Sequence, residues 1–136
     1  MPSEFSRVSV GIDLVCVSRV TESLCRFGDR FLRRLFTEGE IAYANTSPEL
    51  ASERLAARFA AKEATIKALD LVEHGVGWRS IEVERSPRGR CRLILHGRAR
   101  AAADAAGFAE LSVSLSHEGE YATAVVLAIR QKEHQL

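Results

Sequence analysis

Apolar and polar residues alternate at the start of the sequence, over residues 8–15. The apolar positions of this stretch are Val8, Val10, Ile12 and Leu14. Strict alternation that includes β-branched residues is typical of a β-strand. Successive side chains of a strand point to opposite faces, so Ser9, Gly11 and Asp13 share the other face. Asp13 is therefore predicted to lie on the polar face of this strand.

Short helical patterns follow the strand. Ser18 is predicted to cap a helix over 19–27, and residues 29–36 have the composition of a second helical piece. Thr37 and Glu40 have the spacing of a capping box, in which each side chain accepts a hydrogen bond from the other residue's backbone N–H group. This pair predicts the start of a third helix.

The strongest helical signal covers residues 49–69, which contain no glycine or proline and are rich in alanine, leucine, glutamate, lysine and arginine. Ser47 followed by Pro48 is typical of an N-cap and a first helical position. The apolar residues predicted to line one side of this helix are Leu55, Phe59, Ile66 and Leu69. The segment is expected to be the central helix of the protein.

The second half of the chain has the pattern of two β-hairpins with a helix between them. The hairpin strands are predicted over 81–84 with 91–95 and over 111–115 with 121–129, and the helix over 97–106. An early strand, a long helix and two hairpins predict an α+β fold, in which one long central helix packs on a mostly antiparallel sheet. We expect a single domain over 1–136, with a frayed tail at about 131–136.

Composition narrows the class of protein. The chain has 136 residues, 46% of them hydrophobic, and a formal net charge of +1, which argues against a nucleic-acid binder that works by bulk positive charge. The three cysteines have no CxxC spacing and predict neither a disulfide framework nor a zinc site. The N-terminus lacks the apolar run of a signal peptide, and no stretch approaches the roughly 18 apolar residues of a membrane span. We therefore expect a cytoplasmic protein with no membrane partner.

The nearly neutral total hides a basic segment. Between residues 19 and 34 there are five arginines and only two acidic residues, Glu22 and Asp29. The arginines are Arg19, Arg26, Arg30, Arg33 and Arg34. Such a segment is either a docking site for an acidic partner or a solvated helical face.

Two further groups of side chains could carry chemistry. Phe59, Glu63 and Lys67 fall on one stripe of the long helix, beside Arg58 and Lys62, and could bind a ligand or simply form helix ion pairs. The other group consists of three alternating serines that lead to a histidine: Ser112, Ser114, Ser116 and His117. Hydroxyls beside an imidazole suit a phosphate, although a polar outer face of a sheet has the same pattern. The sequence contains no Walker A loop, Rossmann GxGxxG motif or GxSxG elbow.

Three blocks of sequence occur together, in order. They are Gly11-Ile12-Asp13 followed by Arg19, Arg58-Phe59-Ala60-Ala61-Lys62-Glu63-Ala64 followed by Lys67-Ala68, and Ser114-Leu115-Ser116-His117 followed by Tyr121-Ala122. In these blocks the chain resembles the holo-acyl-carrier-protein synthases, the small bacterial group of the 4′-phosphopantetheinyl transferases. The resemblance covers roughly residues 8–129 and implies the fold of that family.

The resemblance also implies a reaction. Enzymes of this family transfer 4′-phosphopantetheine from coenzyme A to a serine of apo acyl carrier protein and release adenosine 3′,5′-bisphosphate. By resemblance, Asp13 and Glu63 would hold Mg²⁺, or Mn²⁺ in its place, and Lys67 would neutralise charge on the diphosphate of coenzyme A. The base that accepts the serine proton would be Glu63 or a water on the metal.

The remaining site residues follow from the same resemblance. Arg58 and His117 would hold the 3′-phosphate of coenzyme A, and Lys62 and Ser116 are further expected contacts of this co-substrate. Arg19 matches the family's docking arginine for the acidic carrier protein. Charge alone adds Arg26 and Arg30 to the expected docking surface.

The resemblance further implies a homotrimer with active sites between subunits, in which one chain supplies Asp13 and Glu63 and its neighbour supplies other contacts. Two alternatives stay open at this point. The protein could be a non-catalytic coenzyme A-binding module or subunit, or the same enzyme could act on the carrier of a polyketide or another secondary metabolite.

Overall fold

The computed structural model describes residues 7–132, so the ends of the chain, including most of the expected frayed tail, lie outside the described residues. The strands are β1 (Val8–Cys16), β2 (Ile81–Arg85), β3 (Cys91–Leu95), β4 (Phe108–Glu118) and β5 (Tyr121–Arg130). The helices are α1 (Val17–Phe27), α2 (Asp29–Leu35), α3 (Glu38–Asn45), α4 (Ala51–Leu69) and α5 (Gly97–Ala105). Short 3-10 turns lie at Pro48–Leu50, Val72–His74 and Trp78–Ser80.

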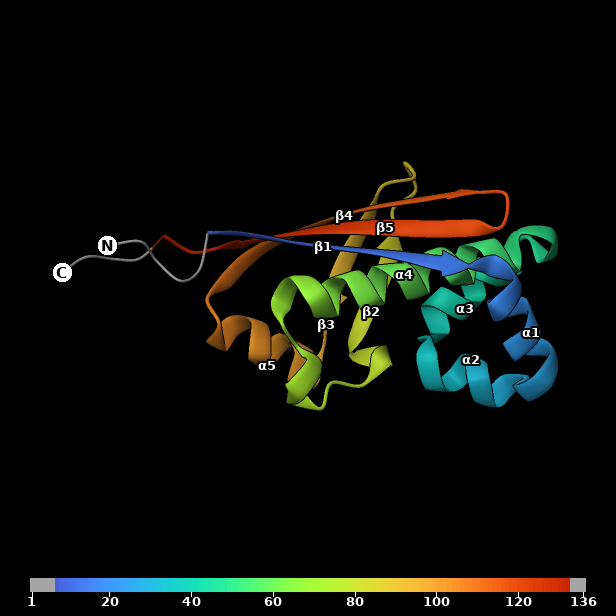
Figure 1. Cartoon of the computed structure of the whole chain (residues 1–136), viewed down its shortest axis with the longest axis horizontal. Helices are drawn as coiled ribbons and strands as arrows, with labels where there is room; N and C mark the ends of the chain where they lie inside the picture. Colours follow the sequence, from blue (N-terminus) through green and yellow to red (C-terminus); the bar gives the residue numbers. More distant parts are fainter. Residues whose placement is uncertain (1–6, 133–136) are drawn as a thin grey trace.

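The strands form two antiparallel sheets. β1, β5 and β4 make the larger sheet in that order, so β5 is central and β1 and β4 are its edges, and β2 pairs with β3 in a separate hairpin. Helix α4 packs along one face of the larger sheet. Helices α1–α3 are gathered at one end of the molecule and α5 lies toward the other end (Figure 1). The β2–β3 hairpin contacts α4 through β2. The predicted α+β class, with a long helix on an antiparallel sheet, is confirmed.

Small residues allow α4 to lie very close to the sheet. Ala60, Ala61, Ala64 and Ala68 of α4 are all buried, and a Cβ atom at Gly11 of β1 would lie only 2.0 Å from the carbonyl oxygen of Ala64. Any side chain at position 11 would therefore push the helix away. Alanines, rather than the predicted row of larger apolar residues, form most of the helix surface that meets the sheet.

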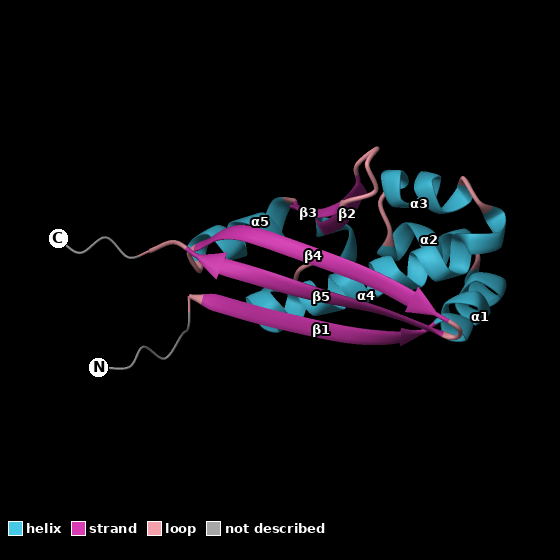
Figure 2. Cartoon of the chain, turned by 90° about the horizontal axis from the view of Figure 1, so that it is seen from above, coloured by secondary structure: helices cyan, strands magenta, loops and turns pink. Residues whose placement is uncertain are grey.

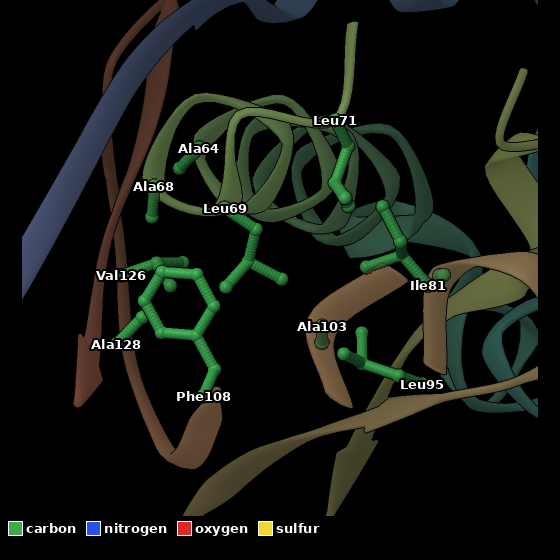
Figure 3. Close-up of a cluster of buried hydrophobic side chains, with 11 residues drawn as sticks. Ala64, Ala68, Leu69, Leu71, Ile81, Leu95, Ala103, Phe108, Val126 and Ala128 are labelled. Atoms are coloured by element: carbon green, nitrogen blue, oxygen red, sulfur yellow. The ribbon is translucent and has the colours of Figure 1, made fainter. Parts of the chain in front are cut away.

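Larger side chains fill the space around the end of α4. Leu69 and Leu71 pack against Ile81 and Leu95 of the β2–β3 hairpin and against Phe108 at the start of β4 (Figure 3). This cluster joins the hairpin and α5 to the helix and the larger sheet. The two sheets therefore share one core instead of forming separate units.

The predicted helix starts are partly confirmed. Thr37 and Glu40 form the capping box, with the Glu40 N–H donating to the Thr37 hydroxyl at 3.2 Å and the Thr37 N–H donating to the Glu40 carboxylate at 2.9 Å. The prediction for Ser18 is wrong, because α1 begins at Val17 and its N-cap residue is Cys16. Pro48 starts a 3-10 turn that leads into α4.

The outer face of the larger sheet is exposed, and over β1 and part of β5 it is apolar. Val10, Ile12 and Leu14 are 61%, 63% and 63% exposed, and Leu127, opposite Val10 on β5, is 43% exposed. No helix of the described residues covers this face (Figure 2). Soluble proteins rarely leave a contiguous apolar surface uncovered unless it binds something. Within residues 7–132, no helix is both long and apolar enough to cross a membrane.

Candidate active site

The polar face of β1 meets the Glu63 side of α4 and brings three charged residues together. Lys67 Nζ lies 3.0 Å from the Asp13 carboxylate and also donates to the carbonyl oxygen of Ile12 at 3.0 Å. The lysine side chain is 54% exposed and the Asp13 side chain 21% exposed, so the pair lies at the surface. The structure thus places Asp13 beside Lys67, while the metal-binding role that the resemblance implies for Asp13 and Glu63 stays a prediction.

Of these three charged residues, Glu63 has the fewest compensating contacts. Burial, followed by repulsion from Asp13, raises the pKa of the Glu63 carboxyl, and Lys67 only partly opposes this rise. Within residues 7–132, Glu63 has no hydrogen-bond or ion-pair partner. Two carboxylates from different elements that repel each other, one of them without a partner, fit a hard divalent cation such as Mg²⁺, which takes one or two carboxylates and completes its shell with other oxygen atoms.

Backbone contacts fix the position of Asp13 against α4. The Thr123 hydroxyl on β5 donates to the Asp13 carbonyl oxygen at 2.7 Å, and the Ser9 hydroxyl donates to the carbonyl oxygen of Ala68 at 2.6 Å. The Ser9 bond and the close approach at Gly11 hold β1 on the helix, and the Thr123 bond holds the Asp13 backbone on β5. Gly11 and Thr123 are thus positioning residues that the sequence reading missed as part of the site. A glycine on the polar face of an otherwise β-branched strand was the available signal.

A cleft of about 330 Å³ opens beside Asp13. Its walls include Arg19 and Val20 of α1, Phe31 of α2 and Phe59 of α4. The cleft places the predicted docking arginine, Arg19, next to the carboxylate site. Its lining therefore combines apolar side chains with one cation, Arg19, and one carboxylate, Asp13.

The other expected docking residues lie farther along the helical end. Arg26 is exposed and its guanidinium lies over the Phe27 ring at 5.6 Å. Arg30 lines a second cleft, of about 530 Å³, together with Phe27, Phe31 and Arg34. Apolar rings flanked by arginines form this surface, which suits an acidic partner with an apolar side.

The opposite side of α4 carries the other two predicted cations, and Lys62 requires a correction. Its side chain is fully buried, 2.8 Å from the equally buried Glu40 carboxylate, and it donates to the carbonyl oxygens of Trp78, at 3.0 Å, and Ile81. Burial lowers the pKa of Lys62, and the Glu40 charge opposes that shift. All three donors of the ammonium are used inside the protein. Lys62 therefore ties α4 to α3 and the β2–β3 hairpin and has no free donor for coenzyme A.

Arg58 lies on the same side, away from Asp13. Its guanidinium lies over the ring of Tyr43 on α3 at 4.3 Å, and the residue is only 4% exposed. Burial lowers the pKa of Arg58, although Cys91 of β3 and Tyr43 oppose the shift. Arg58 thus faces α3 and β3, which lie on the β4 side of the sheet (Figure 2).

His117 and Ser116 lie at the end of β4. His117 is exposed and opposite Ala122, and Ser116 is exposed on the outer face, opposite Thr123. Strand β5 separates both residues from β1 and Asp13. The predicted residues therefore fall into two groups. An acidic group lies at the β1 edge (Asp13, Glu63 and Lys67), and a phosphate-type group lies on the β4 side (Arg58, Ser116 and His117).

Comparison with known proteins identifies the family. The sequence pattern described as the 4′-phosphopantetheinyl transferase superfamily matches residues 9–126. The chain belongs to this superfamily. A holo-[acyl-carrier-protein] synthase of Koribacter versatilis is 45% identical over 121 residues, which cover 88% of this chain and 96% of that protein. Relatedness at this level over nearly full length confirms the family resemblance seen in the three sequence blocks.

Solved structures agree with this place in the phosphopantetheinyl transferase superfamily. A Chronobacterium ammoniagenes ACPS–CoA complex is similar with a TM-score of 0.81 and 36% identity, covering 93% of this chain and 100% of that one. Helicobacter pylori holo-[acyl-carrier-protein] synthase in complex with coenzyme A is similar with a TM-score of 0.76 and 30% identity, covering 88% and 98%. The architecture described above is thus that of enzymes crystallised with coenzyme A.

Proposed function

We propose that this protein is a holo-[acyl-carrier-protein] synthase, which transfers 4′-phosphopantetheine from coenzyme A to a serine of apo acyl carrier protein. The names of its relatives and the coenzyme A complexes of its structural neighbours support this reaction. The observation that carries the proposal is the pair of carboxylates, Asp13 and Glu63, beside Lys67, with Asp13 on the wall of a cleft. This donor set suits a diphosphate held with a divalent cation.

In this reaction the serine oxygen of the carrier attacks the phosphorus that bears the pantetheine arm, and adenosine 3′,5′-bisphosphate leaves. Asp13 and Glu63 would hold Mg²⁺, or Mn²⁺, and the ion would neutralise charge on the diphosphate. Lys67, half-exposed beside Asp13, adds a second positive charge at the same place. The raised pKa of Glu63 also suits it to accept the serine proton, and a metal-bound water is the competing base.

The acidic and phosphate-type groups lie on opposite sides of β5, so we propose that a complete site is formed by two copies of the chain. The exposed apolar outer face of the sheet supports a homotrimer that covers this surface. One copy would supply Asp13, Glu63 and Lys67, and its neighbour would supply Arg58, Ser116 and His117.

The carrier protein would dock on the helical end. Arg19 lies on the wall of the cleft beside Asp13, Arg30 lines the second cleft, which shares Phe31 with the first, and Arg26 is an exposed cation of the same helical end. An acidic carrier would therefore be guided toward the carboxylate site with its serine near the cleft. The proposal also includes a cytoplasmic location. It includes no nucleic-acid partner and no membrane partner.

The direct test mixes the purified protein with coenzyme A, Mg²⁺ and apo acyl carrier protein, and then measures the mass of the carrier. We expect the carrier to gain one phosphopantetheine group, and Asp13→Ala to abolish that gain. Binding of coenzyme A without any mass change would instead identify a non-catalytic coenzyme A-binding module. A gain only with the carrier domain of a polyketide synthase would change the acceptor and leave the chemistry intact.

A further inference from the structure

One carboxylate of the β2–β3 hairpin joins the start of helix α3 to the start of helix α5. Glu82 of β2 accepts a hydrogen bond from the hydroxyl of Thr37, the N-cap residue of α3, at 2.7 Å. On its other side, Glu82 accepts from the ring Nε2 of His96 at 2.9 Å. His96 follows β3 and is the N-cap residue of α5. We call Thr37, Glu82 and His96 the Glu82 bridge.

The first turn of α3 leaves room for this carboxylate. A Cβ atom at Gly39 would lie 3.2 Å from Glu82 Oε2, so a larger residue there would push the carboxylate away from the helix start. Burial works to raise the pKa of Glu82, but the hydrogen bonds from Thr37 and His96 lower it, and the net shift is downward. The helix start and both donors therefore favour the ionised carboxylate.

Helix α3 connects the Glu82 bridge to the β4 side of the protein. Glu40 of α3 pairs with Lys62 of α4 and accepts from the Val83 N–H at 2.8 Å, so the inner side of the helix is fixed. Farther along α3, the centre of the Tyr43 ring lies 4.3 Å from the guanidinium carbon of Arg58. The orientation of α3 therefore sets the position of the Tyr43 ring, and the ring in turn restricts Arg58.

The Glu82 bridge differs from the buried ion pair in its exposure. The side chain of Glu82 is 20% exposed and that of His96 is 50% exposed. Water can therefore reach either group when the other is removed, and no fully buried charge is left without a partner. Loss of the bridge should release the start of α3 without unfolding the protein.

We propose that Glu82 and His96 are positioning residues for coenzyme A binding, which fix the start of α3 and thereby the place of Arg58. The inference rests on the proposed function and deepens it. Both residues act through α3 and need no contact with the co-substrate. Carrier docking, which we assign to Arg19 and the neighbouring arginines of α1 and α2, should not depend on them.

Two pairs of variants test this assignment. Glu82→Leu removes the acceptor, and we expect the KM for coenzyme A to rise about tenfold. The kcat and the KM for the carrier should stay within about twofold of the wild type, since only binding of one substrate is affected. Glu82→Gln keeps an amide that can bond both neighbours and should restore most of the affinity. His96→Leu and His96→Gln should behave in the same way, and His96 is exposed enough to be replaced even if Glu82→Leu does not fold.

An exposed ion pair of the same hairpin provides the matched control. Glu84 of β2 pairs with Arg92 of β3 directly across the hairpin, so Glu84→Leu removes a carboxylate that joins only the two strands. This variant should keep all kinetic constants of the wild type. An unchanged KM for coenzyme A in both leucine variants of the Glu82 bridge, or an equal rise in both KM values, would overturn the assignment.

A binding measurement separates this inference from the proposed function. Calorimetric titration with adenosine 3′,5′-bisphosphate needs no carrier and no transfer. We expect Glu82→Leu and His96→Leu to weaken this binding by the same factor of about ten, and their glutamine counterparts to recover it. A failed transfer assay would overturn the proposed function and leave this result standing. Equal binding by the leucine and glutamine variants would overturn the positioning role alone.

Discussion

The two sides of helix α4 carry similar charges in opposite environments. On one side, Lys67 and Glu63 lie at the surface beside Asp13, and Glu63 has no partner among the described residues. On the other side, Lys62 is fully buried, and its three donors are used by Glu40 and two carbonyl oxygens. A lysine paired with a carboxylate therefore occurs twice on one helix, once at the surface and once inside.

The comparison distinguishes charged groups that stabilise the fold from charged groups that remain free to bind a ligand. A buried ion pair with every donor satisfied fixes the arrangement of the elements around it and has nothing left to offer a ligand. A surface pair beside an unsatisfied carboxylate holds the fold only weakly, and it keeps the capacity to bind an ion or a phosphate. Substitutions on the Lys62 side should thus lower mainly stability, and substitutions on the Glu63 side should lower mainly activity.

The largest effect is expected from Lys62→Met, which leaves the Glu40 carboxylate buried and unpaired. Breaking a buried ion pair in this way costs about 3–5 kcal/mol of unfolding free energy. Chemical denaturation should show this loss, and the matched variant Lys67→Met should unfold close to the wild type. A double variant, Glu40→Leu with Lys62→Met, should recover much of the stability because no charge is left unpaired. Equal stability of Lys62→Met and Lys67→Met would contradict the distinction.

Glu63→Gln should lower the rate of transfer and leave the stability of the fold nearly unchanged. It removes one charge from the proposed metal site without changing shape, and we expect the rate of transfer to fall by about 100-fold or more. The measurement is the initial rate of carrier modification with Mg²⁺ held limiting. Glu49→Gln, at an exposed position before the same helix, is the control and should keep the wild-type rate. Near-normal activity of Glu63→Gln would remove this residue from the site.

Gly11→Ala should affect both quantities, because a methyl group at this position meets the Ala64 carbonyl oxygen. We expect a loss of about 1–3 kcal/mol in stability. Transfer activity should also fall, as Asp13 moves relative to Glu63. Gly77→Ala, where a Cβ meets nothing within 4 Å, should change neither. Full activity of Gly11→Ala would show that the close helix–strand contact does not position the site.

Arg19→Glu should weaken carrier docking at the cleft on the Glu63 side. The charge reversal is expected to raise the KM for the carrier about tenfold, with a smaller effect at high salt. The KM for coenzyme A should stay nearly constant. Arg98→Glu, at an exposed position of α5, serves as the control. A similar rise in both KM values would remove the docking role from Arg19.

The smallest effect concerns stability against pH. The raised pKa of Glu63 means that folding disfavours its ionised form, so the stability contributed by this residue falls as the pH rises from the ordinary glutamate pKa to the raised one. Glu63→Gln should therefore be slightly more stable than the wild type at neutral pH. The advantage should vanish at acidic pH, where both side chains are neutral. Thermal unfolding at several pH values measures the difference, and a larger advantage at acidic pH would contradict the assigned origin of the shift.

The sequence predicted the elements well because periodicity and turn residues are local signals. The alternation over 8–15, the long helix and the capping box of Thr37 and Glu40 all appear in the structure. It could not reveal which face of β1 is covered. Alanines of α4 and Gly11 let the polar face pack against the helix, and the apolar face of Val10 and Ile12 stays exposed in the single chain.

The candidate site could be predicted only in part, because sequence patterns are local and the packing of distant segments is not. Spacing placed Glu63 and Lys67 on one stripe of the long helix, and only the family resemblance joined Asp13 to them; the structure places Asp13 beside Lys67. Lys62 follows Arg58 by four residues and looks like a ligand in sequence, yet its partner Glu40 lies on another helix. Such long-range pairing cannot be seen in local spacing. Arg54, Arg58 and Arg85 are likewise brought around the Tyr43 ring only by the fold.

The central claim is that the two sides of α4 contribute to one active site from different copies of the chain. The most direct measurement co-expresses two inactive variants, Glu63→Gln and the double variant Arg58→Lys with His117→Ala, and assays the mixed oligomer. In a ring with random equal mixing, about a quarter of the shared sites would hold both intact halves, so about a quarter of the wild-type rate should return. If both halves belonged to the same chain, no mixed site would be intact and the mixture would be as inactive as its components.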